Sequence, residues 1–399
     1  MSTTQQKFDP LAAAGDFYDI RGQLDPGERT VVDGVRDYME REVAPIINDF
    51  WGRAEFPRKA VWGLRDLGIT GSQFDEHGCP GMSNLASGLI SMEISRVDPS
   101  VGTFFGVHSG LALGSIVLCG DEEQKAEWIP KLLSWDKIGA FGLTEIETGS
   151  GVALGLQTTA TRDGDSWLLN GNKKWIGNGT FADVIVVWAR DVEDDQVKGF
   201  LLETPAEGFT AEKIEGKVAL RAVENAVLRF DNVRVPETHR LQRANSFRDT
   251  AKVLRLTRGG VAWNSVGCAM GAYEAARAYA IRREQFGRPI ASFQLIQDLL
   301  ARMLAGITAS QCVASRLSAL QENGKVSEQQ AAMAKMYCTT RTREVVQWAR
   351  EVMGGNGILL ENDVARFFVD SEALYSYEGT REVNSLIVGR AITGYGAFV

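Results

Sequence analysis

The first third of the chain carries apolar residues at helical spacing. Val32, Val35, Tyr38 and Met39 stand at i, i+3, i+6 and i+7, a roughly helical rhythm, and the Asp-Pro pair at 25–26 is typical of a helix start. Residues 85–118 are apolar on most sides, as helices buried between other helices usually are. The pattern therefore predicts helices from about 26 to 135.

Near Gly139 the pattern changes to one that is typical of strands. Asp163-Gly164 and Asn170-Gly171 are turn pairs between β-prone runs, which is the signature of hairpins. We interpret residues 139–240 as a small β-domain that Pro236 closes. Its strands are predicted over residues 158–160, 167–169, 184–188, 199–202 and 226–230.

The helical rhythm returns after about residue 247. Gly287 and Pro289 break the first long helix, and the GGNG run at 354–357 is typical of a helix end. Helices are predicted over residues 248–284, 293–322 and 327–353, with a last one starting near Arg381.

The predicted order of elements is α, then β, then α. It lacks alternating βα units, so it does not indicate a doubly wound nucleotide-binding sheet. We expect a mainly α fold with a central β-domain, because 399 residues exceed one typical core. The predicted domains are an all-α N-terminal domain (1–138), a middle β-domain (139–245) and a C-terminal helical bundle (246–399).

Composition excludes several function classes. The net charge of −8 disfavours nucleic-acid binding, because phosphate contact needs clustered Lys and Arg. We expect no run of about 18 uncharged apolar residues, and so no membrane span. The five scattered cysteines and three histidines lack zinc-site spacing, so no metal site is expected. Reduced thiols fit a cytoplasmic protein best. Any acid–base chemistry is then expected to use a carboxylate.

Two glycine- and tryptophan-containing motifs are candidates for binding a planar or phosphorylated group. FGLTE at 141–145 and TGSG at 148–151 offer close backbone approach and N–H donors to a flavin edge or a phosphate, or they form a linker between domains. Trp175, within KKWIGN at 173–178, can lie flat on a planar ring, or it can fill the core.

Three further motifs lie in the C-terminal third. Arg283, in RREQFG at 282–287, can bind pyrophosphate through two hydrogen bonds, or it caps the helix carbonyls. VMGGNG at 352–357 lacks the Lys and Ser/Thr of a phosphate loop, so a plain helix stop is the alternative. Glu378 follows Tyr377, whose bulk would raise the pKa of the carboxyl and make it a stronger base. Glu378 could equally be a capping residue.

In this order and spacing the motifs resemble the acyl-CoA dehydrogenase family across essentially the whole chain. The resemblance leans towards the glutaryl-CoA dehydrogenase and plant short-chain acyl-CoA oxidase branches. It implies a helical N-terminal domain, a middle β-barrel, a C-terminal four-helix bundle, and a homotetramer with one FAD per subunit. The matching stretches are FGLTEIETGSG, NGNKKWIGNGTFAD, RREQFGRPIASFQ, VMGGNGI and YEGTREVNSLIVGRAITG.

The resemblance also implies roles for single residues. Ser150, Arg258, Tyr377 and Gly379 match positions that contact or lie near the acyl-CoA substrate, and Glu378 matches the catalytic base. Residues matching FAD contacts of the same subunit are Phe141, Leu143, Thr144, Gly149, Ser150, Trp175, Ile176 and Thr380. Residues matching contacts with a neighbouring subunit's FAD are Arg283, Gln285, Phe286, Gln294, Met353, Gly354 and Gly355.

The implied reaction is dehydrogenation of an acyl-CoA thioester to trans-2-enoyl-CoA. The Glu378 carboxylate would abstract the α-proton in a dry pocket while hydride leaves to flavin N5. The expected electron acceptor is an electron-transfer flavoprotein. An acyl-CoA oxidase that uses O₂ is one alternative, and a non-catalytic acyl-CoA-binding protein of the same fold is another.

The chain departs from the family pattern at positions that bear on specificity. Gly177 replaces a Thr that reaches flavin N5 in many members, which predicts a more open edge and O₂ reactivity. Gly102 replaces the Arg that holds a distal carboxylate in glutaryl-CoA dehydrogenases, so no preference for glutaryl-CoA is expected. Phe104 and Phe105 are expected to fill the acyl tunnel and favour short or branched chains.

Overall fold

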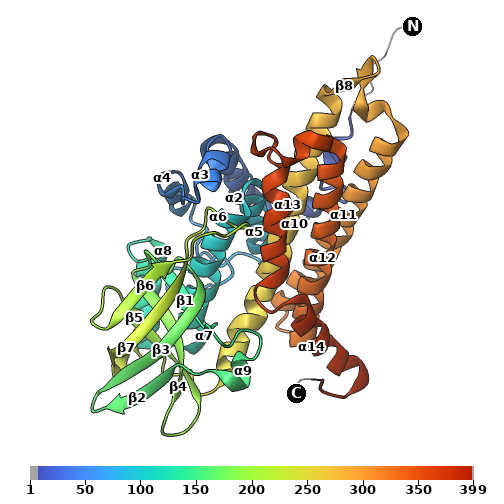
Figure 1. Cartoon of the computed structure of the whole chain (residues 1–399). Helices are drawn as coiled ribbons and strands as arrows, with labels where there is room; N and C mark the ends of the chain where they lie inside the picture. Colours follow the sequence, from blue (N-terminus) through green and yellow to red (C-terminus); the bar gives the residue numbers. More distant parts are fainter. Residues whose placement is uncertain (1–7, 398–399) are drawn as a thin grey trace.

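The computed structural model describes residues 8–397, which form three regions in chain order (Figure 1). Residues 1–7 and 398–399, which belong to the predicted first and third domains, lie outside the described range. The first region is helical. Its helices are α1 (Pro10–Ala13), α2 (Pro26–Tyr38), α3 (Ile47–Arg53), α4 (Arg58–Trp62), α5 (Asn84–Val97), α6 (Pro99–Phe105), α7 (Leu113–Cys119) and α8 (Glu122–Leu133).

Helix α2 begins where the sequence predicts. The Asp25 carboxylate accepts hydrogen bonds from the backbone N–H groups of Gly27 and Glu28, at 2.8 and 3.0 Å. These bonds satisfy donors that the first turn of a helix leaves free. Val32 and Val35 are completely buried, so the predicted apolar stripe faces the core.

The predicted absence of an apolar run long enough to cross a membrane is wrong by length and composition alone. The continuous helical segment Pro99–Cys119 contains no Asp, Glu, Lys or Arg and is long and apolar enough to cross a membrane by length and composition. Of its most apolar window, 78% is buried inside the protein. The segment is therefore packed as a core helix of this region, which explains its apolar character on most sides.

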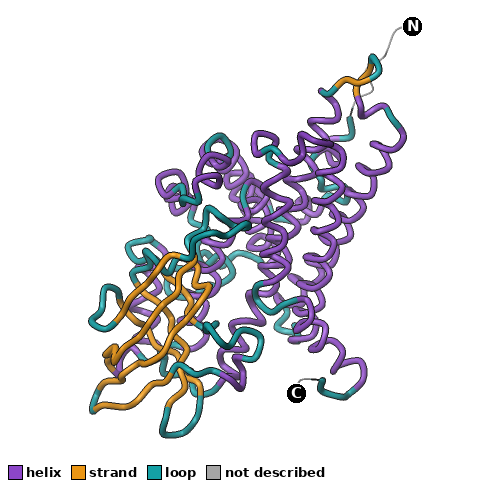
Figure 2. Tube along the Cα trace, in the orientation of Figure 1, coloured by secondary structure: helices purple, strands orange, loops and turns teal. Residues whose placement is uncertain are grey.

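The second region is a curled sheet of seven strands that forms a half-barrel, shown in orange at the lower left of Figure 2. The strand order is β1-β4-β2-β3-β7-β6, with β5 also paired to β4. The strands are β1 (Gly139–Gly142), β2 (Thr159–Asp163), β3 (Ser166–Gly177), β4 (Val184–Asp191), β5 (Val197–Glu203), β6 (Phe209–Lys213) and β7 (Asn225–Pro236). The predicted end of the β-segment at Pro236 is confirmed.

The two predicted turn pairs behave differently. Asp163-Gly164 lies at the β2–β3 turn, where Gly164 has φ of +64°, as predicted. Asn170-Gly171 lies inside β3 at a shift of the β3–β7 register, so the prediction of a turn there is wrong. A Cβ atom at Gly171 would lie 2.8 Å from the Thr158 Cα atom. The glycine therefore permits close backbone approach at a bulge.

The third region is a bundle of three long helices and two shorter ones (Figure 1). The three predicted long helices are confirmed to within two residues. The helix α13 between the GGNG run and Glu378 was not predicted. The helices are α10 (Phe247–Arg282), α11 (Gln294–Glu322), α12 (Glu328–Met353), α13 (Val364–Ser376) and α14 (Arg381–Thr393).

A buried ion pair joins α13 to the first region. The Arg366 guanidinium lies 2.7 Å from the Asp98 carboxylate and also donates to the Val97 carbonyl and the Asn48 side chain, both at 2.9 Å. Both charged side chains are almost fully buried. Helix α13, which leads directly to Glu378, is therefore fixed to the core of the N-terminal region.

Candidate functional site

A cavity of about 1520 Å³ opens where the three regions meet. Its wall combines α5, the segment Pro99–Cys119, the loop after β1, the end of β3, α10 and the turn between α13 and α14. The predicted site residues that line it are Phe141, Leu143, Thr144, Gly149, Ser150, Trp175, Ile176, Arg258, Tyr377, Glu378, Gly379 and Thr380.

Glu378 lies in the turn between α13 and α14 with a backbone φ of +55°, and Gly379 follows at +81°. A non-glycine residue in this left-handed region is strained by roughly 1–3 kcal/mol, and such residues cluster at functional sites. The side chain of Thr380, not that of Glu378, caps α14 by accepting a hydrogen bond from the Val383 N–H. The alternative that Glu378 caps this helix is therefore wrong.

The environment of Glu378 suits a base. Burial raises the pKa of its carboxyl above the usual value, since the charged form loses solvation. The Thr257 hydroxyl donates a hydrogen bond to Glu378 Oε2 at 2.7 Å, which fixes the carboxylate and opposes that rise. The positive charges of Arg258 and Lys335 also lower the pKa of Glu378. The result is a partly desolvated carboxylate held in one orientation.

Arg258 lies on the cavity wall one residue after Thr257. Its side chain is 7% exposed and its Nη1 atom forms an ion pair with Glu328 Oε1 at 3.2 Å. Among the described residues its Nε–H has no hydrogen-bond partner. Arg258 therefore acts on Glu378 through its charge and not through a direct bond.

The opposite wall comes from the β-region and suits a flat ring. Phe141, Leu143 and Ile176 are buried, whereas the Trp175 side chain is 53% exposed at the cavity. The alternative that Trp175 fills the core is therefore wrong. A Cβ atom added at Gly149 would meet nothing within 4 Å, so the TGSG loop presents open backbone.

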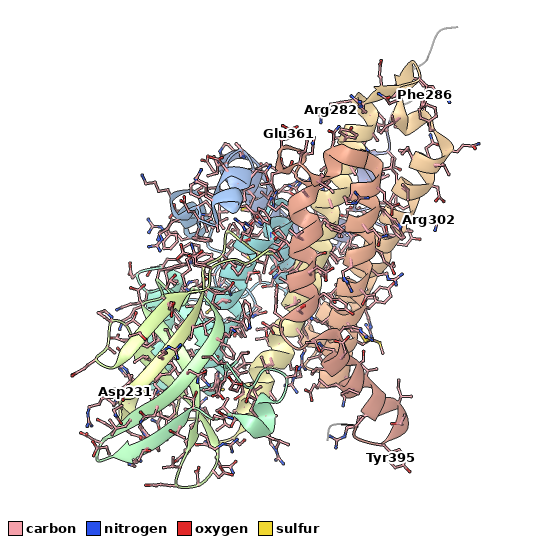
Figure 3. The ribbon with its side chains drawn as sticks, in the orientation of Figure 1. Asp231, Arg282, Phe286, Arg302, Glu361 and Tyr395 are labelled. Atoms are coloured by element: carbon pink, nitrogen blue, oxygen red, sulfur yellow. The ribbon has the colours of Figure 1, made fainter. Side chains whose placement is uncertain are left out.

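The predicted contacts to a neighbouring subunit lie elsewhere. Arg283, Gln285 and Phe286 are exposed at the hairpin of β8 (Glu284–Gln285) and β9 (Arg288–Pro289), and Phe286 is 93% exposed (Figure 3). Gln294 is also exposed, at the start of α11. Along α10, Arg283 is about 37 Å from Arg258 at 1.5 Å per residue. These residues therefore do not reach the cavity of their own chain.

Met353, Gly354 and Gly355 lie at this same far end of the bundle. Met353 is buried and the two glycines are exposed. The next residue, Asn356, donates a hydrogen bond to the Tyr279 hydroxyl at 2.7 Å, close to the end of α10. The run ends α12, and none of its three predicted residues lines the cavity.

Sequence reasoning missed three residues that hold the Glu378 turn: Thr257, Lys335 and Asn384. Thr257 bonds to the carboxylate, while the other two donate to backbone carbonyls of the turn. The only signal in the sequence is a polar residue on an otherwise apolar helix face. Such a residue reveals its partner only once the helices are packed.

The expected tunnel aromatics divide into two roles. Phe105 lines the cavity, as predicted. Phe104 does not, because it is completely buried against Phe56, Trp62 and Trp135, with ring centroids 4.8, 5.8 and 5.4 Å away. The prediction that Phe104 fills the tunnel is wrong, since this cluster uses it as core.

Gly102 does not line the cavity and packs against α5. A Cβ atom there would lie 2.0 Å from the Ser95 hydroxyl oxygen, which donates a hydrogen bond to Asn264 at 3.1 Å. The α6 backbone therefore packs directly on α5 at this point. A side chain as large as Arg has no room at position 102 without displacing Ser95.

Comparison with known proteins agrees with this geometry. The family models for the N-terminal, middle and C-terminal domains of acyl-CoA dehydrogenase match residues 25–136, 140–233 and 247–393. The mitochondrial short-chain specific acyl-CoA dehydrogenase of Bos taurus is 33% identical over 366 residues, covering 90% of this chain and 89% of the relative.

Solved structures are similar over nearly the whole chain. A glutaryl-CoA dehydrogenase from Mycobacterium smegmatis in complex with FADH2 has a TM-score of 0.93 and 35% identity, covering 97% of this chain and 100% of that one. A chain in the structure described as the electron transferring flavoprotein of Acidaminococcus fermentans has a TM-score of 0.89 and 31% identity, covering 93% and 99%. The chain belongs to the acyl-CoA dehydrogenase family.

Proposed function

We propose that this protein oxidises short-chain acyl-CoA thioesters to trans-2-enoyl-CoA and passes the electrons to an electron-transfer flavoprotein. Membership of the family carries the reaction class, FAD-dependent dehydrogenation of acyl-CoA. The observation that supports it best is the Glu378 carboxylate, which faces the cavity with a raised pKa and a 2.7 Å bond from Thr257.

The residues present fit FAD. The exposed Trp175 indole and the open backbone at Gly149 give a flat, accessible wall on the side of the cavity formed by the β-region. Thr144, Ser150 and Thr380 line the same cavity and offer hydroxyl groups to a polar ligand. When bound, FAD accepts the hydride that leaves the acyl β-carbon.

The protein itself supplies the base and its placement. A thioester α-C–H is a weak acid, so its removal needs a carboxylate whose pKa is raised by desolvation. Glu378 provides this group. Thr257 donates a hydrogen bond to its Oε2 atom, so Oε1 is the carboxylate oxygen that Thr257 does not bind. Glu378 takes up the α-proton, and the double bond forms between the α- and β-carbons.

The wall residues support a short acyl chain without a distal carboxylate. Phe105 and Trp263 are large, nearly buried side chains on the cavity wall. With Gly102 packed on α5, the cavity gains no cation from that position to neutralise a second carboxylate. A buried, unpaired carboxylate is costly, so glutaryl-CoA is expected to be a poor substrate despite the similarity to glutaryl-CoA dehydrogenases.

The choice of acceptor is supported by the relatives and by the packing beside Gly177. The relatives are described as dehydrogenases, and one structural neighbour's description names an electron transferring flavoprotein. A Cβ atom at Gly177 would lie 3.1 Å from a Val107 methyl group. The side chain of Val107 therefore takes the space that a Thr would fill, which argues against the open edge expected for an oxidase.

An anaerobic substrate panel tests this function. Mixing the yellow holoenzyme with butyryl-CoA should bleach the flavin absorption. Glutaryl-CoA should bleach it with a second-order rate constant at least roughly 10-fold lower, because burying one unpaired charge costs more than about 1.36 kcal/mol. Turnover should require an external acceptor, and admitting air should yield little peroxide. Rapid peroxide formation would favour the oxidase, and absence of bleaching by any acyl-CoA would favour a binding protein.

A homotetramer is also proposed, with Arg283, Gln285 and Phe286 reaching the FAD of a neighbouring chain. Their exposure at the far end of the bundle supports it. The measured native mass should equal four chains of 43.7 kDa, and Arg283→Ala should weaken FAD retention without changing that mass. A monomer that keeps FAD would contradict this assembly.

The five free cysteines support a reducing compartment, and we propose the cytoplasm.

A further inference from the structure

A buried lysine beneath the Glu378 turn has no role in the reaction described above. Lys335 lies on α12 and its side chain is 0% exposed. Its Nζ atom donates hydrogen bonds to the carbonyl oxygens of Tyr375 and Gly379, each at 2.8 Å. Within residues 8–397, no carboxylate forms an ion pair with it. Lys335 is thus an amino group buried against two backbone carbonyls.

The two carbonyls stand on either side of Glu378. Tyr375 is in the last turn of α13, whose carbonyls lack partners within the helix, and Gly379 directly follows Glu378. Asn384 on α14 adds hydrogen bonds to the carbonyls of Gly379 and Thr380, at 2.8 and 3.0 Å. Side chains from two helices therefore hold the strained backbone that carries Glu378.

A charged group is an expensive choice for this task. The pKa of Lys335 is lowered to about 7, mainly by burial and also by the Arg258 charge, while Glu378 and Glu382 oppose the fall. A neutral amide such as Asn384 holds the same carbonyl without that cost. When protonated, Lys335 adds a positive charge that a neutral donor lacks. Among the charged groups that act on the pKa of Lys335, the Glu378 carboxylate has the largest effect.

We propose that Lys335 is a positioning residue for the dehydrogenation: its two hydrogen bonds hold the Glu378 turn, and its charge stabilises the Glu378 carboxylate. The proposal rests on the proposed function, because it assigns Lys335 its effect through the catalytic base. Lys335 is not among the residues that line the cavity. The charged groups that act on this lysine and carboxylate are Arg258 on α10, Glu378 in the turn and Glu382 on α14.

The variants Lys335→Met and Lys335→Gln separate the two effects. Methionine removes donors and charge, so kcat with butyryl-CoA should fall about 10- to 100-fold, as expected when a reacting group is misplaced by about 1 Å. FAD content and KM should change little. Losing the charge raises the pKa of Glu378, so the pH of half-maximal kcat should move upward. Glutamine keeps two donors, so it should recover part of kcat yet keep the pH shift.

Lys217→Met is the matched control. Lys217 is a half-buried lysine that likewise donates to two backbone carbonyls, those of Leu220 and Val223 at 2.8 and 2.6 Å, but Glu378 is not among the charges acting on it. It should leave the pH profile unchanged. Asn384→Leu removes carbonyl bonds without a charge, so it should lower kcat with no pH shift, and it serves if Lys335→Met does not fold.

Two results would overturn the proposal. One is wild-type kcat and pH profile in Lys335→Met, and the other is parallel loss of FAD and activity without a pH shift, which marks a structural role. Backbone hydrogen exchange gives a readout that needs no activity. Exchange over residues 376–380 should rise in Lys335→Met, and an unchanged rate would refute the positioning. If the wild type fails to bleach with any acyl-CoA, the proposed function fails, and this exchange result still decides the positioning.

Discussion

The Glu378→Gln variant should bind FAD and acyl-CoA but lose turnover. The amide has nearly the same shape as the carboxyl and can still contact Thr257, so the cavity should persist. It cannot take up the α-proton at neutral pH. General-base catalysis contributes roughly 10²–10⁴-fold, and we expect a loss of about 10³-fold or more in the rate of flavin reduction by butyryl-CoA. Flavin absorbance followed anaerobically gives that rate.

Glu372→Gln is the matched control for this experiment. Glu372 also lines the cavity and lies on α13 six residues before Glu378, but its side chain is exposed and forms an ion pair with Arg343 at 2.8 Å. The same chemical change there should leave the rate within about twofold, since exposed ion pairs contribute about 1 kcal/mol or less. Fast bleaching by Glu378→Gln would assign the base to another residue.

The Arg366→Met variant should show the largest loss of stability. It leaves the Asp98 carboxylate buried without its 2.7 Å partner, beside the buried carboxyl of Asp370. Removing one partner of a buried ion pair costs roughly 3–5 kcal/mol. Thermal unfolding should shift down by about 5–10 °C, and activity should fall with it because α13 carries the Glu378 turn.

Two further variants make the interpretation specific. The double variant Asp98→Asn with Arg366→Met removes both charges and keeps an oxygen to cap α6, so it should recover part of the lost stability. Arg302→Met breaks only the exposed pair with Asp298 and should shift the melting temperature by less than about 2 °C. No loss in Arg366→Met would show that this pair does not hold α13.

The sequence predicted elements wherever the apolar pattern and the start and stop signals agreed. The ends of α10 and α12 follow from Gly287, Pro289 and the GGNG run. Helix α13 was not predicted because the buried polar side chains of Arg366 and Asp370 interrupt its apolar stripe. Their partners lie far away in the sequence: Asp98 pairs with Arg366, and Trp51 and Leu220 donate hydrogen bonds to Asp370. Strand β6 was not predicted because most of its residues are exposed. Strand β1 was not predicted because all four of its residues are buried, so it lacks the alternation of apolar and polar positions.

The candidate site shows the same division. Motifs with an unusual local sequence, such as Trp175 two residues before Gly177 and Glu378 directly before Gly379, could be recognised, and they do line one cavity. Glycine signals were ambiguous, since Gly171 proved to mark a bulge. Thr257 and Lys335 were not visible, because 121 residues separate Thr257 from Glu378 and 44 separate Lys335 from Gly379. Only packing of α10 and α12 against the turn brings them together.

The central claim is that Glu378 removes the α-proton of an acyl-CoA while flavin is reduced. Rapid anaerobic mixing of the wild-type holoenzyme with butyryl-CoA deuterated at the α-carbon tests it most directly. The account predicts that bleaching slows severalfold relative to the undeuterated substrate, and that Glu378→Gln shows almost no bleaching with either. Equal rates for both substrates, together with normal bleaching in Glu378→Gln, would contradict it.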